Sequence, residues 1–544
     1  MKNYKKYFFI GLIFSLLACN SDGLINEIDN KKIFIYNESN GISSLDPAFA
    51  SNFENISAIN QIFNGLVQLD EKLDVKPCIA KSWEISENGK KYTFNLRKDV
   101  FFHESAHMKK SKRVTSNDFV YSFNRILDPE IASPGIWIFR DVAKNDKGEY
   151  AFLAPNDSTF IIELNHPFPP FLSILSMQYC SVVPKEVVEN FGKDFRSNPI
   201  GTGPFYFKFW KEGEKLILLK NENYFELDSN NNKLPYLDAI NIYFIKDRFT
   251  EFLEFTGGKF DMMPSLDASY KDEIITQKGD IKSQYSNNIT LLVSPFIKTD
   301  YLGFMLDGNF NTPFSKNKKV RKAIAFAINR DEMVMFLRNN MGYSAKTGIV
   351  PKGVQSFRED IDLPLVYNIQ MAKKLLEEAG FPNGKGLPTI KLSITPSYLD
   401  LCEFIQFQLK QIGINVDLEV LPPAIHNQKS AKGELAFFRK SWMGDYADAE
   451  NFLSLFYSGN FCPKGPNYTH FKNEKFDNLY EKAKITIDDS LRFQLYYEME
   501  DILLEEMPVI PIYYDKAVKF TQKRINGLKM NSLNLLNLKT VRKN

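Results

Sequence analysis

The sequence predicts a mixed α/β protein with more than one lobe. Three patterns indicate this: a strand–turn–strand pattern around Asn88–Gly89, capped amphipathic helices, and a strand–helix–strand pattern between residues 390 and 420. The chain has 544 residues, too many for one compact core, which indicates two to four domains or lobes. With 44% hydrophobic and 25% charged residues, the composition is that of a globular protein and excludes a disordered or polytopic membrane chain.

The first predicted pair of elements is a β-hairpin. Trp83 and Ile85 alternate with polar residues before Asn88–Gly89, a strong two-residue turn signal, and Tyr92 and Phe94 alternate after it. A two-residue loop pairs Ile85 with Tyr92. It also pairs Trp83 with Phe94, so apolar side chains face each other across the ladder.

Helices are predicted from capping signals. Thr115 and Asp118 form a capping box ahead of an amphipathic pattern that ends at Asp128–Pro129. A second helix is predicted over residues 320–329, and a third over 369–379 with Asn368 as its N-cap.

The strand–helix–strand pattern predicts parallel pairing. Apolar residues alternate over 390–394, follow helical spacing over 401–412, and alternate again over 414–420. Such a βαβ unit places its two strands parallel in one sheet, with a right-handed crossover.

The first nineteen residues predict the compartment. Three lysines precede an apolar run from Tyr7 to Ala18, which at about 12 residues is too short to span a bilayer. The run ends in Leu-Leu-Ala-Cys19, which looks like a lipobox, so we expect residues 1–18 to be a signal peptide and Cys19 to be lipidated. Residues 19–30 would then be the lipidated cysteine and its linker. The alternative is a plain secretory signal with a chance cysteine.

Charge and cysteine content exclude several function classes. The 68 Lys and Arg balance 66 Asp and Glu, which gives no basic footprint for nucleic acid. Five cysteines in the whole chain exclude a disulfide scaffold or a thiolate metal cluster. We expect no cofactor and no metal, and we expect four cysteines to be buried as apolar residues: Cys78, Cys180, Cys402 and Cys462.

One motif has the form of a zinc site. His103, Glu104 and His107 match H-E-x-x-H, which on a helix places both imidazoles on one face to hold zinc while the glutamate activates a bound water. Here the motif follows a strand and precedes a lysine-rich stretch without an apolar stripe. We therefore interpret it as a solvated loop, and a zinc metallopeptidase is the alternative from another function class.

A second constellation surrounds Asp445. This carboxylate stands between Trp442 and Tyr446, with Arg439 six positions before it. One interpretation is a partly buried turn with a surface ion pair. The other is a cation site, because a carboxylate screened from water by aromatic walls holds an ammonium group more tightly. The residues alone leave both interpretations open.

Motifs spread along nearly the whole chain resemble the family 5 extracellular solute-binding proteins, the oligopeptide and dipeptide binders of ABC importers. Their order over about 470 residues is specific to that family, although each motif alone is weak. The motifs are Leu45 to Pro47, Phe63 to Leu66, Ile79 to Ile85, Tyr92 to Asp99, Val114 to Arg125, Gly201 to Phe205, Asn223 to Phe225, Val320 to Ile324, Asn329 to Asp331, Ala372 to Gly380 and Met507 to Tyr514.

The resemblance implies a two-lobed α/β fold of the type II periplasmic-binding-protein kind, with an extra inserted α/β domain. It implies that residues 24–65, 184–283 and 513–544 form lobe I, that residues 66–183 form the inserted domain, and that residues 284–512 form lobe II. It also implies that the protein is not an enzyme.

The implied function is that of a substrate-binding lipoprotein, which captures peptides between its lobes and delivers them to an ABC permease. The family's Trp-x-x-Asp motif falls on Trp442 and Asp445, so Asp445 would pair with the peptide's α-amino group beside Tyr446. Arg439 would reach the carboxylate end. Met443 stands where some members have a disulfide-bonded cysteine, so no bridge is expected there.

The resemblance also implies partners and a location. We expect a monomer, lipid-anchored in the cell envelope on the periplasmic or outer face, with no nucleic-acid partner. A different ligand on the same fold, such as a metal chelate or an oligosaccharide, is the alternative within this class.

Overall fold

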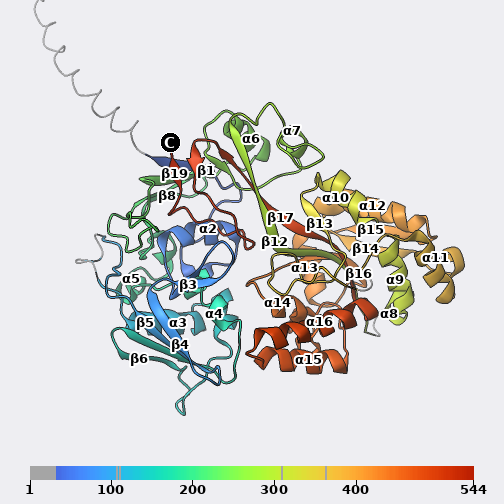
Figure 1. Ribbon diagram of the computed structural model, residues 1–544, viewed down its shortest axis with the longest axis horizontal. Coiled ribbons are helices and arrows are strands. Elements are labelled where there is room, and N and C mark those ends of the chain that lie inside the picture. Colours follow the sequence, from blue (N-terminus) through green and yellow to red (C-terminus); the bar gives the residue numbers. More distant parts are fainter. Residues whose placement is uncertain (1–31, 106–107, 109–111, 308–309, 311, 362–363) are drawn as a thin grey trace, which may run out of the picture.

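The computed structural model describes residues 32–105, 108, 112–307, 310, 312–361 and 364–544 (Figure 1). The predicted signal peptide, Cys19, its linker and residues 24–31 of the expected lobe I lie outside the described residues. Within the described ranges, no helix has the length and apolar character needed to cross a bilayer.

One large mixed sheet runs through both halves of the molecule. Its strand order is β15-β14-β16-β12-β17-β11-β1-β10-β9-β8, and β13 pairs with β17. The bounds are β1 (Ile33–Asn37), β8 (Phe205–Lys211), β9 (Lys215–Lys220), β10 (Ala239–Tyr243), β11 (Met262–Met263), β12 (Ile289–Phe304), β13 (Gly342–Ser344), β14 (Ile390–Ile394), β15 (Val416–Val420), β16 (Phe437–Met443) and β17 (Val509–Gln522).

Two long strands join the halves. β12 and β17 pair antiparallel from Ile289↔Gln522 to Gly303↔Val509, and they run between the two halves in Figure 1. We call residues 32–288 with 523–544 the N-half and residues 305–508 the C-half. The mixed α/β prediction is confirmed.

The C-half has a helical layer on each face of its strands. One apolar core contains residues of α8 (Pro313–Lys316), α9 (Lys318–Ala327), α10 (Arg330–Arg338), α11 (Ile369–Glu378) and α12 (Leu399–Lys410). A second core contains residues of α14 (Glu450–Leu453), α15 (Glu474–Ile485) and α16 (Asp489–Glu506). In β16, Phe437 packs into the first core and Phe438 into the second, because successive side chains of a strand point to opposite faces.

The predicted βαβ unit is confirmed. β14 and β15 are parallel with Ile390 opposite Val416, and α12 connects them. The predicted helix over 369–379 is α11, where the Asn368 side chain accepts a hydrogen bond from the N–H of Met371.

A separate four-stranded sheet lies in the N-half, in the order β4-β5-β7-β6. The hairpin register is confirmed, with Ile85 opposite Tyr92 and Trp83 opposite Phe94. Burial is uneven, however, because β4 is an edge strand: Tyr92 is buried whereas Ile85 is 45% exposed. The strands are β4 (Ala80–Ile85), β5 (Lys91–Leu96), β6 (Phe152–Asn156) and β7 (Thr159–Glu163).

The remaining elements complete the two halves. The capping box of Thr115 and Asp118 starts α3 (Ser116–Leu127) as predicted. The four cysteines expected to be apolar are free and buried. Other elements are α2 (Phe53–Ile62), β2 (Val67–Leu69), β3 (Val75–Pro77), the short helix η2 (Pro134–Phe139), α4 (Phe171–Ile174), the short helix η3 (Gln178–Cys180), α5 (Lys185–Phe191), α6 (Arg248–Thr256), α7 (Lys271–Ile274), α13 (Pro423–Ala431), β18 (Ile525–Asn526) and β19 (Arg542–Lys543).

Candidate functional site

β16 leads to the predicted Trp-x-x-Asp site and leaves one of its edges open. On one side it pairs with β12 from Phe304↔Phe437 to Lys298↔Met443. On the other side it pairs with β14 only where Ser393 lies opposite Phe438. Beyond that position no described strand covers this edge, so its backbone groups are available to an added strand.

Asp445 follows the end of β16 and lines a cavity of about 310 Å³ between the two halves. The carboxylate is open to solvent, and protein atoms crowd around it, so desolvation raises its pKa above the ordinary value for aspartate. Residues of both halves line this cavity, among them Trp137, Ile138, Arg140, Asp141 and Phe168 from the N-half and Trp442, Tyr446, Glu450, Asn451, Lys464 and Tyr480 from the C-half.

Asn451, which sequence analysis did not identify, holds both motif residues. Its Oδ1 accepts a hydrogen bond from Trp442 Nε1 at 2.9 Å and another from the backbone N–H of Asp445 at 3.3 Å. Its Nδ2 donates to Asp445 Oδ2 at 3.5 Å. One buried amide therefore fixes the ring and the carboxylate relative to each other.

Tyr446 joins the two halves. Its ring is buried in the apolar core of the N-half, with its centroid 6.3 Å from that of Trp137. Its hydroxyl donates to one carboxylate oxygen of Glu450, and the hydroxyl of Tyr480 donates to the other. Burial raises the pKa of Glu450, while the two hydroxyl groups favour its ionised form.

Arg439 does not line the cavity of Asp445. It is three residues before Trp442 on the same strand, so its side chain lies on the opposite face, toward the α9–α12 layer. There it is 6% exposed, forms an ion pair with Asp300, and stacks on the ring of Tyr398. Burial lowers the pKa of Arg439 to about 10. Of the two interpretations left open, the surface ion pair does not hold for Arg439, because its ion pair with Asp300 is buried.

The buried ion pair of Arg439 is part of a larger charged cluster, in which Lys298 and Arg338 are half-buried. Lys298 lies 3.4 Å from Asp300 and 2.8 Å from Asp515. Asp515 also accepts from Arg338 at 3.0 Å. These distances join three cations to two carboxylates, beside a cavity of about 260 Å³ that Arg338, Tyr398 and Asp515 line.

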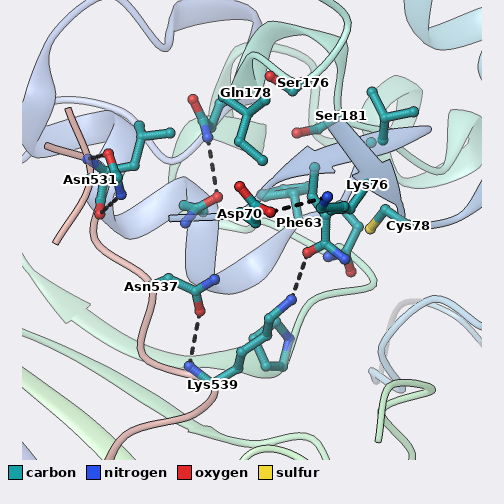
Figure 2. A pocket seen from close by; sticks show the side chains of 18 of the residues that line it. Phe63, Asp70, Lys76, Cys78, Ser176, Gln178, Ser181, Asn531, Asn537 and Lys539 are labelled. Carbon is teal, nitrogen blue, oxygen red and sulfur yellow. Dashed lines mark hydrogen bonds and ion pairs between the residues drawn. The ribbon is translucent and has the colours of Figure 1, made fainter. Parts of the chain in front are cut away.

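A third cavity, of about 250 Å³, lies among α2, the β2–β3 hairpin and the C-terminal segment (Figure 2). Its polar side chains are engaged with one another: Lys76 with Asp70 at 3.2 Å, Gln178 with Asn60 at 3.1 Å, and Lys539 with Gln68 at 2.6 Å. Because these groups already have partners, the cavity is a polar junction between segments rather than a charged binding site.

The H-E-x-x-H motif does not form a metal site in the described residues. His103 is buried, so the expectation of a solvated loop is wrong for it: the Gly201–Gly203 segment packs over the ring. Its Nε2 lies 2.9 Å from the carbonyl oxygen of Gly203, and burial lowers its pKa to about 4. Glu104 is exposed, and His107 lies outside the described residues. No group of three metal-ligating side chains occurs in the described ranges.

A family sequence model and individual relatives agree on the kind of protein that this chain resembles. Residues 74–461 match the sequence model of the bacterial extracellular solute-binding proteins, family 5. The chain is 26% identical to the dipeptide-binding protein DppE of Bacillus subtilis, with 98% of each chain covered. It is 28% identical to heme-binding protein A of Haemophilus influenzae, with 94% of each covered.

A solved structure has the same fold. The periplasmic binding protein DppA of Helicobacter pylori, in complex with the peptide STSA, superposes with a TM-score of 0.75 at 27% identity. The match covers 95% of this chain and 99% of that one, so the two-lobed type II architecture is shared over the whole length.

Proposed function

The chain belongs to the bacterial extracellular solute-binding proteins of family 5, and from this premise we propose that it captures peptides for an ABC importer. The family consists of binding proteins rather than enzymes. The names of the Bacillus subtilis relative and of the peptide complex from Helicobacter pylori support a peptide ligand. The observation that carries the proposal is a carboxylate, Asp445, in an aromatic-walled cavity between the halves.

In this proposal Asp445 binds the α-ammonium group of the peptide. Attraction between unit charges grows as the surroundings exclude water, and a peptide bound in this cavity would cover the exposed carboxylate of Asp445. Trp137 and Trp442 line the same cavity and add aromatic faces to which cations are attracted. The negative charge of Asp445 also acts on Tyr179 of the N-half. Burial is the main cause that raises the pKa of Tyr179 to about 12, and the Asp445 carboxylate adds to the rise.

The open edge of β16 supports recognition of the peptide backbone. An extended peptide that pairs with this edge offers the same backbone donors and acceptors whatever its sequence. Charge at the two ends then fixes register and length, while the side chains are read weakly.

The charged cluster around Lys298 supports binding of the peptide's carboxylate. Three cations share two carboxylates there, so one positive charge has no balancing partner in the cluster. A ligand lying in the plane of the sheet can approach this cluster although Arg439 faces away from the Asp445 cavity. Within β16 the four steps from Arg439 to Met443 span about 13 Å at about 3.3 Å per residue, a length that suits short peptides.

The proposal includes the division into lobe I, inserted domain and lobe II, with the boundaries given by the resemblance. The paired strands β12 and β17 support it, because they are where the halves can hinge. We further propose that a lipid on Cys19 holds the protein at the membrane, and that the closed monomer is what the permease recognises.

Calorimetry tests the amine site. We expect Asp445→Ala to lower the affinity for a short free peptide by about 2 to 5 kcal/mol, the range for removing one partner of a buried charge pair. Asp141→Ala is the matched control, because Asp141 lines the same cavity but is paired with His166 at 3.2 Å. Equal affinity of the unmodified protein for free and N-acetylated peptides would contradict the proposal.

A second candidate ligand is a heme or another metal chelate, which the Haemophilus influenzae relative favours by its name. Native mass spectrometry of the purified protein separates the two candidates. A co-purified peptide supports the first, and a co-purified tetrapyrrole or metal complex supports the second.

A further inference from the structure

Asn451 lies beneath the amine site and contacts both of its motif residues. It is 5% exposed, and its amide makes hydrogen bonds with the indole of Trp442, the backbone of Asp445 and the carboxylate of Asp445. The acceptor oxygen serves the first two contacts and the donor nitrogen serves the third. The two ends of the amide therefore have separable roles.

Several other ionisable groups lie around the cavity, and three of them have partners of their own. Among the lining residues, Glu450 is held by two tyrosine hydroxyls and Asp141 by His166. Arg140 pairs with Asp141 at 3.4 Å. The charge of Asp445 contributes to the raised pKa of Tyr179 in the N-half, and Lys464 lines the cavity from the C-half. Among the described residues, the side chain that donates a hydrogen bond to the Asp445 carboxylate is the neutral amide of Asn451.

The neutrality of this donor has a chemical consequence. A lysine or arginine at this position would orient the carboxylate but would also neutralise it, and so compete with the ligand's ammonium group. An amide orients the oxygen and stabilises its charge without adding a positive one.

We propose that Asn451 is the positioning residue of the amine site: it aligns Trp442 with Asp445 and keeps the empty site negatively charged. The inference rests on the proposed function, because it assigns a role within the same site. In this role Asn451 acts through Asp445, whose carboxylate it orients. The desolvation that raises the pKa of Asp445, and the opposing effect of the Asn451 hydrogen bond, agree with this role.

Asn451→Asp replaces the neutral donor with a negative charge and keeps the acceptor oxygen. This change is nearly isosteric and keeps an oxygen for Trp442 and for the backbone N–H, but it places a second carboxylate oxygen beside Asp445. Two adjacent carboxylates raise the pKa of the pair, so affinity for a free peptide should be lost at a higher pH on acidification than in the unmodified protein. Asn451→Ala should weaken binding of the same peptide by about tenfold or more.

The controls separate this role from a purely structural one. N-acetylated peptide should bind both variants as it binds the unmodified protein, since it carries no ammonium group. Asn368→Asp is the matched control for the added charge: the Asn368 side chain caps α11, accepting from the N–H of Met371 at 2.9 Å, and it does not line this cavity. It should leave the pH profile for free peptide unchanged.

Each outcome has a distinct meaning. An unchanged pH profile and affinity in both Asn451 variants, in a protein that prefers free over acetylated peptides, would overturn the inference and leave the proposed function standing. Equal losses for free and acetylated peptides would also overturn it. If the unmodified protein does not distinguish the two peptides, the proposed function itself fails.

Discussion

The charged sites at the two ends of β16 differ in how their charges are balanced. At Asp445 the carboxylate is held by a neutral amide and keeps its charge available in a cavity. At Arg439 the guanidinium is buried and already paired with Asp300. Both sites combine a charge with aromatic rings, so ring and charge alone do not mark a ligand site. What distinguishes them is whether a counter-charge of the protein itself is present.

The largest expected effect comes from removing that counter-charge. Asp300→Ala leaves Arg439 buried without its partner and should lower the free energy of unfolding by about 3 to 5 kcal/mol, as measured by urea denaturation. Asp445→Ala should change stability by less than about 0.5 kcal/mol. Replacing both partners, Asp300→Leu with Arg439→Met, should recover most of the loss. A stable Asp300→Ala protein would remove the distinction between the two sites.

A smaller effect is expected at the cationic cluster. Lys298→Met removes the surplus positive charge and should weaken binding of a short peptide by about 1.5 to 3 kcal/mol, the range for a hydrogen bond to a charged group. Calorimetry with the same peptide as a C-terminal amide provides the comparison, because the amide has no charge to lose. If Lys298→Met weakens binding of the free-acid peptide and of its C-terminal amide equally, the cluster does not bind the peptide's carboxylate.

The contact between the halves should contribute less again. Trp137→Ala removes the ring that packs on Tyr446 and should weaken binding by about 0.5 to 1.5 kcal/mol, the range for an aromatic pair. Because the contact forms when the halves are together, stopped-flow measurements should show faster dissociation with little change in association. A change confined to association would contradict a role in holding the halves closed.

The smallest expected change is the loss of affinity on acidification. The raised pKa of Asp445 means that its carboxyl is protonated at a higher pH than an ordinary aspartate, and protonation removes the charge that binds the ammonium group. Affinity for free peptide should therefore begin to fall earlier on acidification than the ordinary pKa of aspartate predicts. N-acetylated peptide should show a flat profile over the same range, and a parallel fall for both would contradict the assignment.

Local signals in the sequence predicted the local elements correctly. The hairpin register follows from Asn88–Gly89 and the alternation around it, and α3 begins at its capping box. The exposure of Ile85 did not follow, because it depends on β4 being the edge of its sheet. Strand neighbours far apart in sequence decide which side of a hairpin is covered.

The site was predictable in part for the same reason. Trp442, Asp445 and Tyr446 were identified from their pattern, and the structure places all three at one cavity. The opposite orientation of Arg439 would have followed from strand alternation, but no strand was assigned to residues 437–443 from the sequence. The contributions of Trp137 and Asn451 depend on how the chain folds back on itself, which residue spacing does not reveal.

The side chain of Tyr446 links release of a captured solute to the exposure of one aromatic ring. Separating the halves has to withdraw that ring from a core belonging to the other half and expose it to water, which costs about 1.5 to 3 kcal/mol for a large apolar side chain. The lifetime of the bound solute therefore depends on the free energy of hydrating Tyr446, the residue that follows Asp445. Substitutions of Tyr446 should therefore change the dissociation rate of the solute and leave unchanged the preference of the site for a positively charged group.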